Sequence, residues 1–126
     1  MPEPRRWGLS AEEWARAVAD VRSALVEAGR SRRTVTYGDL ARATGDRVQA
    51  RAGALMQLLD EACDPLDQQT GAVCASLVVR ADSGLPGEGY FVWAARTGRD
   101  VTDHGRLWRT EVELVWDAFS SSQELS

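Results

Sequence analysis

The chain is poor in the residues that build disulfide frameworks and metal centres. Its 126 residues include two cysteines, Cys63 and Cys74, and one histidine, His104. Two cysteines are too few for a disulfide framework. With a single histidine they also make a poor zinc set, because structural zinc sites take four ligands at close spacing. We therefore expect no metal and no cofactor, and we place the protein in a reducing cytoplasm.

Long hydrophobic runs are also missing. No apolar stretch approaches the roughly 20 residues that a membrane span requires. The N-terminal sequence Met-Pro-Glu-Pro-Arg-Arg-Trp lacks the apolar core of a signal peptide, so we expect no membrane partner. The chain has no lysine, isoleucine or asparagine, and every basic residue is therefore an arginine, a bias typical of a GC-rich bacterial genome.

The charge is unevenly distributed along the chain. A net charge of -4 at pH 7 argues mildly against a nucleic-acid partner, since neutralisation of phosphates drives such binding. Residues 1–58 nevertheless contain 10 arginines and 7 acidic residues, whereas residues 59–126 contain 5 and 12. The basic first half is compatible with DNA, and the acidic second half favours a protein partner.

Helical periodicity and capping residues predict most of the fold. Ser10 with Glu13, and more weakly Thr36 with Asp39, have the spacing of N-terminal capping boxes. Apolar residues recur at steps of three and four behind them. Pro65 is expected to end the third helix, because proline cannot donate a helical hydrogen bond. The predicted helices span residues 11–28, 37–44, 47–63 and 103–120, with a polar loop over 64–72.

A β-hairpin is predicted between the third and the last helix. Residues 73–81 are rich in valine and leucine, residues 82–89 are dense in turn residues, and residues 90–95 resemble a second strand. The predicted fold class is therefore α+β and mainly α. It is a winged helix-turn-helix with an N-terminal helix, a β-hairpin wing and a C-terminal helix. We expect one domain over residues 1–126, with 1–9 and 121–126 flexible.

Two motifs resemble a known family of DNA-binding domains. The stretches Thr34-Val-Thr-Tyr-Gly-Asp-Leu-Ala41 and Ala50-Arg-Ala-Gly-Ala-Leu55 are similar to the helix-turn-helix of the O6-alkylguanine alkyltransferases and alkyltransferase-like proteins. In that family the tyrosine presses on the DNA backbone and helps to rotate a nucleotide out of the stack, and the arginine fills the gap. The resemblance implies these roles for Tyr37 and Arg51.

Other readings of these residues stay open. Tyr37 is equally consistent with a half-buried aromatic side chain that covers the turn. Arg51 fits a solvated arginine on an alanine-rich helix, because its motif is one residue shorter than that of the family. The arginines at 32, 33 and 47 add basic charge to the same half of the chain and are further candidates for DNA contact.

The reactive motif of the family, Pro-Cys-His-Arg ahead of a Val-Val strand, is absent. If Val78 and Val79 are aligned with that strand, the place of the nucleophile falls on Ala75. Cys74 is one residue away and has no histidine nearby to activate its thiol. We therefore expect no enzyme and no catalytic residue. Alkyl transfer to Cys74 is the least favoured function, and both cysteines are expected in the core.

The glycine-rich segment before Tyr90 is a candidate for the edge of a pocket. Alkyltransferase-like proteins have a lid-like loop at this place, and the resemblance implies that Gly87, Glu88 and Tyr90 border a lesion pocket. The alternative is a structural turn. Among the tryptophans, only Trp7 and Trp93 fall outside apolar helical faces. Glu111 and Glu113 in the last helix are expected to be solvated.

These features favour a non-catalytic protein that binds double-stranded DNA through its third helix and senses or flips an altered base. The main alternative is a module in which the winged helix binds a protein, as a regulator, adaptor or immunity protein, and does not bind DNA. A winged helix serves both purposes, so the fold alone does not decide between them.

Overall fold

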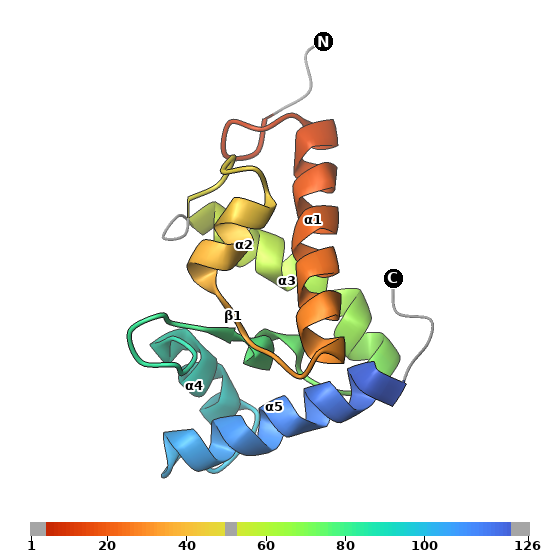
Figure 1. Cartoon of the computed structure of the whole chain (residues 1–126). Coiled ribbons are helices and arrows are strands. Elements are labelled where there is room, and N and C mark those ends of the chain that lie inside the picture. The colour runs from red at the N-terminus through yellow and green to blue at the C-terminus, as the bar shows by residue number, and fades with distance from the viewer. Residues whose placement is uncertain (1–4, 50–52, 122–126) are drawn as a thin grey trace.

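The protein is mainly helical, with one small parallel sheet (Figure 1). The computed structural model describes residues 5–49 and 53–121. The elements are α1 (Ala11–Arg30), β1 (Val35–Thr36), α2 (Tyr37–Ala43), α3 (Gly53–Thr70), the 3-10 helix η1 (Cys74–Leu77), β2 (Val78–Val79), α4 (Glu88–Arg96) and α5 (His104–Ser121). The prediction of a mainly α, α+β protein is therefore confirmed, whereas the winged-helix arrangement is not.

The first two helices begin where their capping residues predict. The Ser10 hydroxyl accepts a hydrogen bond from the Glu13 amide at 3.1 Å, and the Glu13 carboxylate accepts one from the Ser10 amide at 2.9 Å. Thr36 and Asp39 make the same reciprocal pair ahead of α2, at 3.0 and 2.9 Å. Each box satisfies backbone donors that a helix start leaves free, so both starts are fixed locally.

Helix α1 lies across the core and packs against α2, α3 and α5. Its predicted apolar face is buried, including Trp14, Val21 and Leu25. The helix was predicted to end at residue 28, but α1 continues to Arg30. A Cβ atom at Gly29 would lie 2.3 Å from the Phe119 ring of α5, so this glycine serves the close approach of two helices.

The predicted bounds of the third helix are wrong at both ends. Gly45 and Asp46 both have positive φ, and α3 begins at Gly53 instead of residue 47. At the other end α3 continues through Pro65 to Thr70, so the predicted polar loop over residues 64–72 is largely helical.

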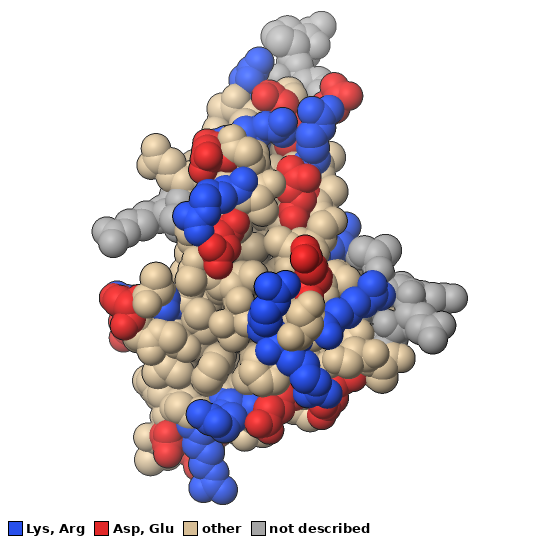
Figure 2. All heavy atoms as spheres, viewed as in Figure 1, with Lys and Arg blue, Asp and Glu red and all other residues tan. Residues whose placement is uncertain are grey.

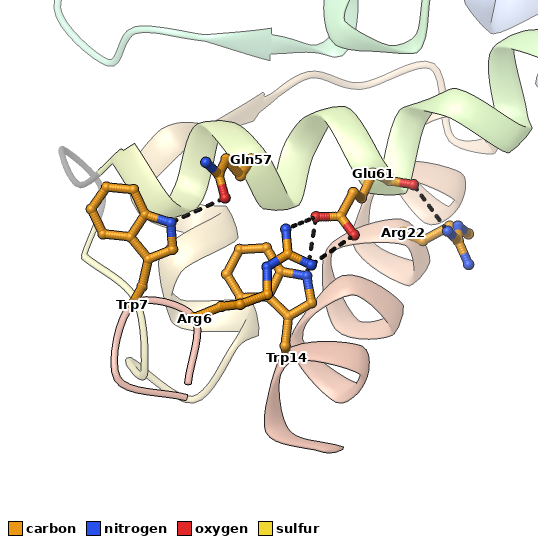
Figure 3. Close-up of polar contacts among 6 residues, drawn as sticks. All are labelled: Arg6, Trp7, Trp14, Arg22, Gln57 and Glu61. Carbon is orange, nitrogen blue, oxygen red and sulfur yellow. Dashed lines mark hydrogen bonds and ion pairs between the residues drawn. The ribbon is translucent and has the colours of Figure 1, made fainter. Parts of the chain in front are cut away.

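An arginine from α1 explains how α3 tolerates Pro65. Proline has no N–H, so it leaves the carbonyl four residues earlier, that of Glu61, without its helical donor. The Arg22 guanidinium donates to the Glu61 carbonyl and to the neighbouring Ala62 carbonyl, both at 3.2 Å. Figure 3 shows Arg22 reaching this carbonyl from α1. The missing hydrogen bond is thus replaced by a charged donor from another helix.

The prediction of a β-hairpin wing is wrong. Residues 74–77 form η1, and β2 pairs in parallel with β1, in the register Val35 with Val78 and Thr36 with Val79. Residues 90–95, predicted as the second strand, belong to α4. Phe91 and Ala94 are buried while Val92 and Trp93 are exposed, which is the spacing of a helix and not the alternation of a strand. The aromatic residues of this segment are typical of a strand, but the residues that are buried recur at the spacing of a helix.

An ion pair joins the segment after α4 to α5. Glu111, expected to be solvated, is buried and pairs with Arg99. The Arg99 guanidinium also lies 4.7 Å from the centre of the Trp93 ring, and Phe91 stacks on His104 at 3.8 Å. These contacts hold α4 against the start of α5. Glu113 is exposed.

The N-terminal residues from Arg5 onward pack against α3, although this segment was expected to be flexible. The Trp7 indole donates to the Gln57 side chain at 3.1 Å, and its ring lies over Gly53, where an added Cβ would come within 2.8 Å of it. Arg6 and the Trp14 indole both bond to Glu61, at 2.7 and 3.1 Å (Figure 3). The outer side of α3 is thereby tied to the beginning of the chain.

The Arg22 contact can be tested by a double-mutant cycle with Pro65. Arg22→Met keeps an apolar stem and removes the donors, so we expect a loss of about 1 kcal/mol in the free energy of unfolding. In a Pro65→Ala background the new N–H occupies the Glu61 carbonyl, and the same replacement should cost clearly less. Urea unfolding of the four proteins gives the coupling energy.

A matched control for this cycle is Arg16→Met, which removes an exposed arginine of the same helix. It should cost little in either background, as exposed substitutions usually do. Strictly additive effects of Arg22→Met and Pro65→Ala would show that Arg22 does not replace the hydrogen bond that Pro65 removes.

Candidate functional site

A cavity of about 710 Å³ lies between the start of α2, one face of α3, η1 and the segment that leads into α4. We call it the site cavity. Its lining comes from segments that are far apart in the sequence: Tyr37, Gly53, Met56, Leu59, Asp60, Cys63, Asp64, Asp67, Val73, Ala75, Arg80, Gly87, Gly89, Tyr90 and Trp93. The volume is within the range of small-molecule sites, roughly 300–1,000 Å³.

Tyr37 connects α2 to the loop before α4. The capping box at Thr36 fixes its backbone, and its half-buried ring lies on the cavity wall. The Tyr37 hydroxyl accepts a hydrogen bond from the Gly87 amide at 3.3 Å. Gly87 is also the N-cap of α4. The structure therefore brings together two residues that were predicted from separate motifs.

Tyr90 lies on the same cavity and is held by a buried residue of η1. The Tyr90 hydroxyl and the Ser76 hydroxyl are 2.8 Å apart. Burial raises the pKa of Tyr90, so the phenol stays protonated at neutral pH. Glu88, the third predicted pocket residue, is exposed at the start of α4 and does not line the cavity.

No activated thiol faces the cavity among the residues that the structure describes. Ala75, aligned with the nucleophile of the resembled family, lines the cavity, whereas Cys74 is fully buried outside its lining. Cys63 does line it. A hydrogen bond with Cys74, together with burial, raises the pKa of the Cys63 thiol well above its ordinary value. A thiol in this state is a poor nucleophile.

Three aspartates form one wall of the cavity. Asp60, Asp64 and Asp67 are spaced at i, i+4 and i+7, which places them on one face of α3. Asp67 accepts a hydrogen bond from the Cys74 amide at 2.8 Å and so connects α3 to η1. We define these residues as the acidic wall.

The acidic wall was missed in the sequence because Pro65 was expected to end the helix. Because residues 64–72 were assigned to a loop, the spacing of the three aspartates did not indicate that they share one face of a helix. The spacing itself was the signal that could have revealed them. Arg80 is the basic residue of the lining, and its guanidinium pairs with Asp82 at 2.7 Å.

Burial perturbs two carboxyl groups of the acidic wall. Burial raises the pKa of Asp67 from 3.8 to about 6, and the nearby Asp64 adds to the rise. Burial also raises the pKa of Asp60, with a further contribution from Glu61. Perturbed carboxyl groups in a cavity are a typical feature of functional sites.

The arginines predicted to contact DNA do not form one compact patch. Arg32 pairs with Asp117 at 2.8 Å and Arg33 with Glu27 at 3.7 Å, both at the end of α1. Arg47 is exposed and lies near the beginning of α1, where it contributes to the lowered pKa of Glu13 after the larger effect of Ser10. These two places are about 26 Å apart along α1. Arg51 lies outside the described residues.

The surface around the cavity mixes opposite charges with exposed apolar groups. On the face shown in Figure 2, basic and acidic side chains are interspersed, and an uncharged area lies between α2 and α4. Met56 and Trp93, which both line the cavity, expose 42% and 36% of their surface. Trp7, beside Gly53, exposes 57%. The opening of the cavity is therefore partly apolar.

Replacing Asp67 should change the pH dependence of stability. In the unfolded chain Asp67 titrates near its ordinary pKa, so between about pH 4 and 6 the folded protein holds the proton more tightly. The stability that protonated Asp67 contributes is fully present below pH 4 and is lost as the pH rises through 6. Asp67→Asn keeps an oxygen for the Cys74 amide and removes the charge.

We expect Asp67→Asn to be more stable than the parent protein at pH 8, by about 1 kcal/mol or roughly 4 °C in Tm, and equally stable near pH 4. Thermal melts at both pH values measure this. The control Glu113→Gln, at an exposed carboxylate of α5, should shift neither melt. A lower Tm for Asp67→Asn at pH 8 would show that the pKa of Asp67 is not raised in the folded protein.

Comparison with known proteins identifies no relative. No known protein family, curated protein or solved structure matches this chain. In residues 5–49 and 53–121, no three or more histidine, cysteine, aspartate or glutamate side chains are grouped as a metal site would require. No helix in these ranges is long and apolar enough to cross a membrane. We therefore infer the function from the site cavity and its chemistry.

Proposed function

We propose that the protein is a non-catalytic DNA-binding protein that holds an altered base in the site cavity after the base has rotated out of a duplex. One observation carries the proposal. Motif resemblance connected Tyr37 to base extrusion, Ala75 to the place of the reactive nucleophile, and Gly87, Glu88 and Tyr90 to the edge of a lesion pocket. All of them except Glu88 line one cavity, although they come from separate segments. A shared cavity is what their common role would require.

The surroundings of the cavity suit this function. A base can be reached from all sides only outside the stack, so a protein that examines it needs a pocket beside its DNA-contacting surface. Here the pocket adjoins the two consecutive helices α2 and α3, and Gly53 at the start of α3 lines it.

The chemistry of the cavity supports binding without reaction. Ala75 offers no nucleophile, and the thiol of Cys63 has a raised pKa and a hydrogen bond to Cys74. The hydroxyls of Tyr37 and Tyr90 are already engaged with Gly87 and Ser76. These groups can shape and orient a ligand, and none of them is poised to attack it.

The alternative is a module that binds a protein partner. Two observations favour it: Arg32 and Arg33 are paired with acidic residues, and Met56 and Trp93 expose apolar surface at the cavity opening. Paired arginines contribute less to phosphate neutralisation, and exposed apolar groups are common in protein interfaces. A test of DNA binding separates the two functions.

Duplex DNA should bind with modest, salt-sensitive affinity and with a preference for a base that is easy to extrude. The probes are a plain duplex and one in which a guanine lies opposite an abasic site. Fluorescence anisotropy at several salt concentrations should give a log-log slope of around -3, as expected for three or four phosphate contacts. No binding of either probe at low salt would favour the protein-partner module.

Substitutions at two residues, Tyr37 and Arg51, test their assignment to DNA contact. Tyr37→Ala should reduce the preference for the abasic-site duplex more than the binding of plain duplex, whereas Tyr37→Phe keeps the ring and should retain the preference. Arg51→Ala should weaken duplex binding by ~1–3 kcal/mol. Arg109→Ala, an exposed arginine on α5, is the matched control and should change little. Equal losses for Arg51→Ala and Arg109→Ala would contradict the assignment.

Alkylated DNA should leave the protein unmodified. The reason is the alanine at position 75 and the protonated state of Cys63. Intact-mass measurement after incubation with a duplex that contains O6-methylguanine is the test. A stoichiometric gain of one methyl group on Cys63 or Cys74 would show that the protein is an alkyl acceptor.

A further inference from the structure

The site cavity has an unusual charge for a pocket that receives part of a polyanion. Its lining contains Asp60, Asp64 and Asp67, and its arginine, Arg80, is paired with Asp82 outside the lining. Gln68 donates to Asp64 at 3.2 Å and the Cys74 amide donates to Asp67, so both carboxylates are held in place. The lining therefore carries a net negative charge at neutral pH, and a phosphate inside it would be repelled.

Aromatic rings line the site cavity together with the acidic wall. Tyr37, Tyr90 and Trp93 all line it, and the rings of Tyr90 and Trp93 lie 5.8 Å apart. The Tyr90 hydroxyl is bonded to Ser76, and the Tyr37 hydroxyl accepts from the Gly87 amide and keeps its own proton, so these residues offer a ligand their aromatic surfaces and the Tyr37 O–H donor. Aromatic faces and carboxylates both attract positive charge, and aromatic faces also stack on planar rings.

We propose that the site cavity selects a base that carries a positive charge because one of its ring nitrogens is alkylated. This inference rests on the proposed function and names the chemical class of its ligand. A cationic base stacks on Tyr37 and Tyr90, because the Arg99 guanidinium already lies over the Trp93 ring, and it gains Coulomb attraction from Asp60, Asp64 and Asp67. A neutral base of the same shape stacks equally well and lacks that attraction. The cavity is therefore selective for the charge of the ligand and not for its size.

A pair of isomers separates charge from shape. 1-Methyladenosine is a cation at neutral pH, and N6-methyladenosine has the same atoms and is neutral. Isothermal titration of the protein with each nucleoside should give at least about tenfold tighter binding of the cation. Equal binding, or tighter binding of the neutral isomer, would overturn the inference.

Removing charge from the acidic wall should abolish the preference for 1-methyladenosine over N6-methyladenosine. In an Asp60→Asn, Asp64→Asn double variant, the ratio of the two affinities should fall to within about threefold. Both side chains are at exposed positions, so the fold should be retained, which a thermal melt checks. Glu113→Gln changes an exposed carboxylate on α5 and should keep the full ratio. An unchanged ratio in the double variant would overturn the role of the acidic wall.

Duplex probes distinguish a base in DNA from a free nucleoside. Each methyladenine is placed opposite an abasic site, so that neither isomer loses a base pair on extrusion. Tighter binding of the 1-methyladenine duplex, lost in the double variant, supports the inference. Duplex binding without discrimination overturns it and leaves the proposed function standing. Discrimination between free nucleosides with no duplex binding overturns the proposed function and identifies a free cationic nucleoside as the ligand.

Discussion

The guanidinium of Arg22 supplies hydrogen bonds that helix α3 cannot make for itself around Pro65. Without a donor for the freed carbonyl, a helix usually kinks or ends at a proline. Because α3 continues, Asp67 is helical and reaches the Cys74 amide, which fixes η1 against α3. Both the acidic wall and the position of Ala75 depend on this continuation, so a contact that α1 makes with α3 shapes the cavity.

The second constraint is the short parallel pairing of β1 with β2. Two residues on each strand are enough to place Val35 and Thr36 beside Val78 and Val79. Thr36 is also the cap of α2, so the strand pairing carries Tyr37 directly to the segment that follows β2. The Gly87 amide then completes the connection by bonding to the Tyr37 hydroxyl. Local capping and a long-range pairing therefore act on adjacent residues to close one side of the cavity.

The sequence was most informative where structure is determined locally. The capping boxes at Ser10 and Thr36 and the apolar face of α1 depend on neighbours a few residues away, and all of them were predicted. Gly87 and Tyr90, which motif resemblance connected to the edge of a pocket, line the site cavity, whereas Glu88 from the same motif does not.

The errors arose where a distant contact outweighs a local preference. Pro65 is accommodated by a side chain from another helix, and the strand-like residues 90–95 become helical where Phe91 and Ala94 pack inward. Glu111 is buried because Arg99 pairs with it across a loop. No local pattern contains these partners, so the acidic wall could be found only after the bounds of α3 were known.

In the proposed complex with DNA, the phosphates and the extruded base would meet different charges on the protein. Phosphates would stay on the outer surface, where Arg47 is exposed, because the acidic wall of the site cavity would repel them. A base is the part of a nucleotide that carries no phosphate charge, so it can enter while its phosphates stay outside. The cost of holding Asp60 and Asp67 partly desolvated is a standing loss of stability at neutral pH, visible in their raised pKa values. A ligand that brings positive charge into the cavity offsets this loss, and a neutral ligand does not. In the proposed function, the same carboxylates that lower stability at neutral pH would therefore distinguish a cationic base from a neutral one.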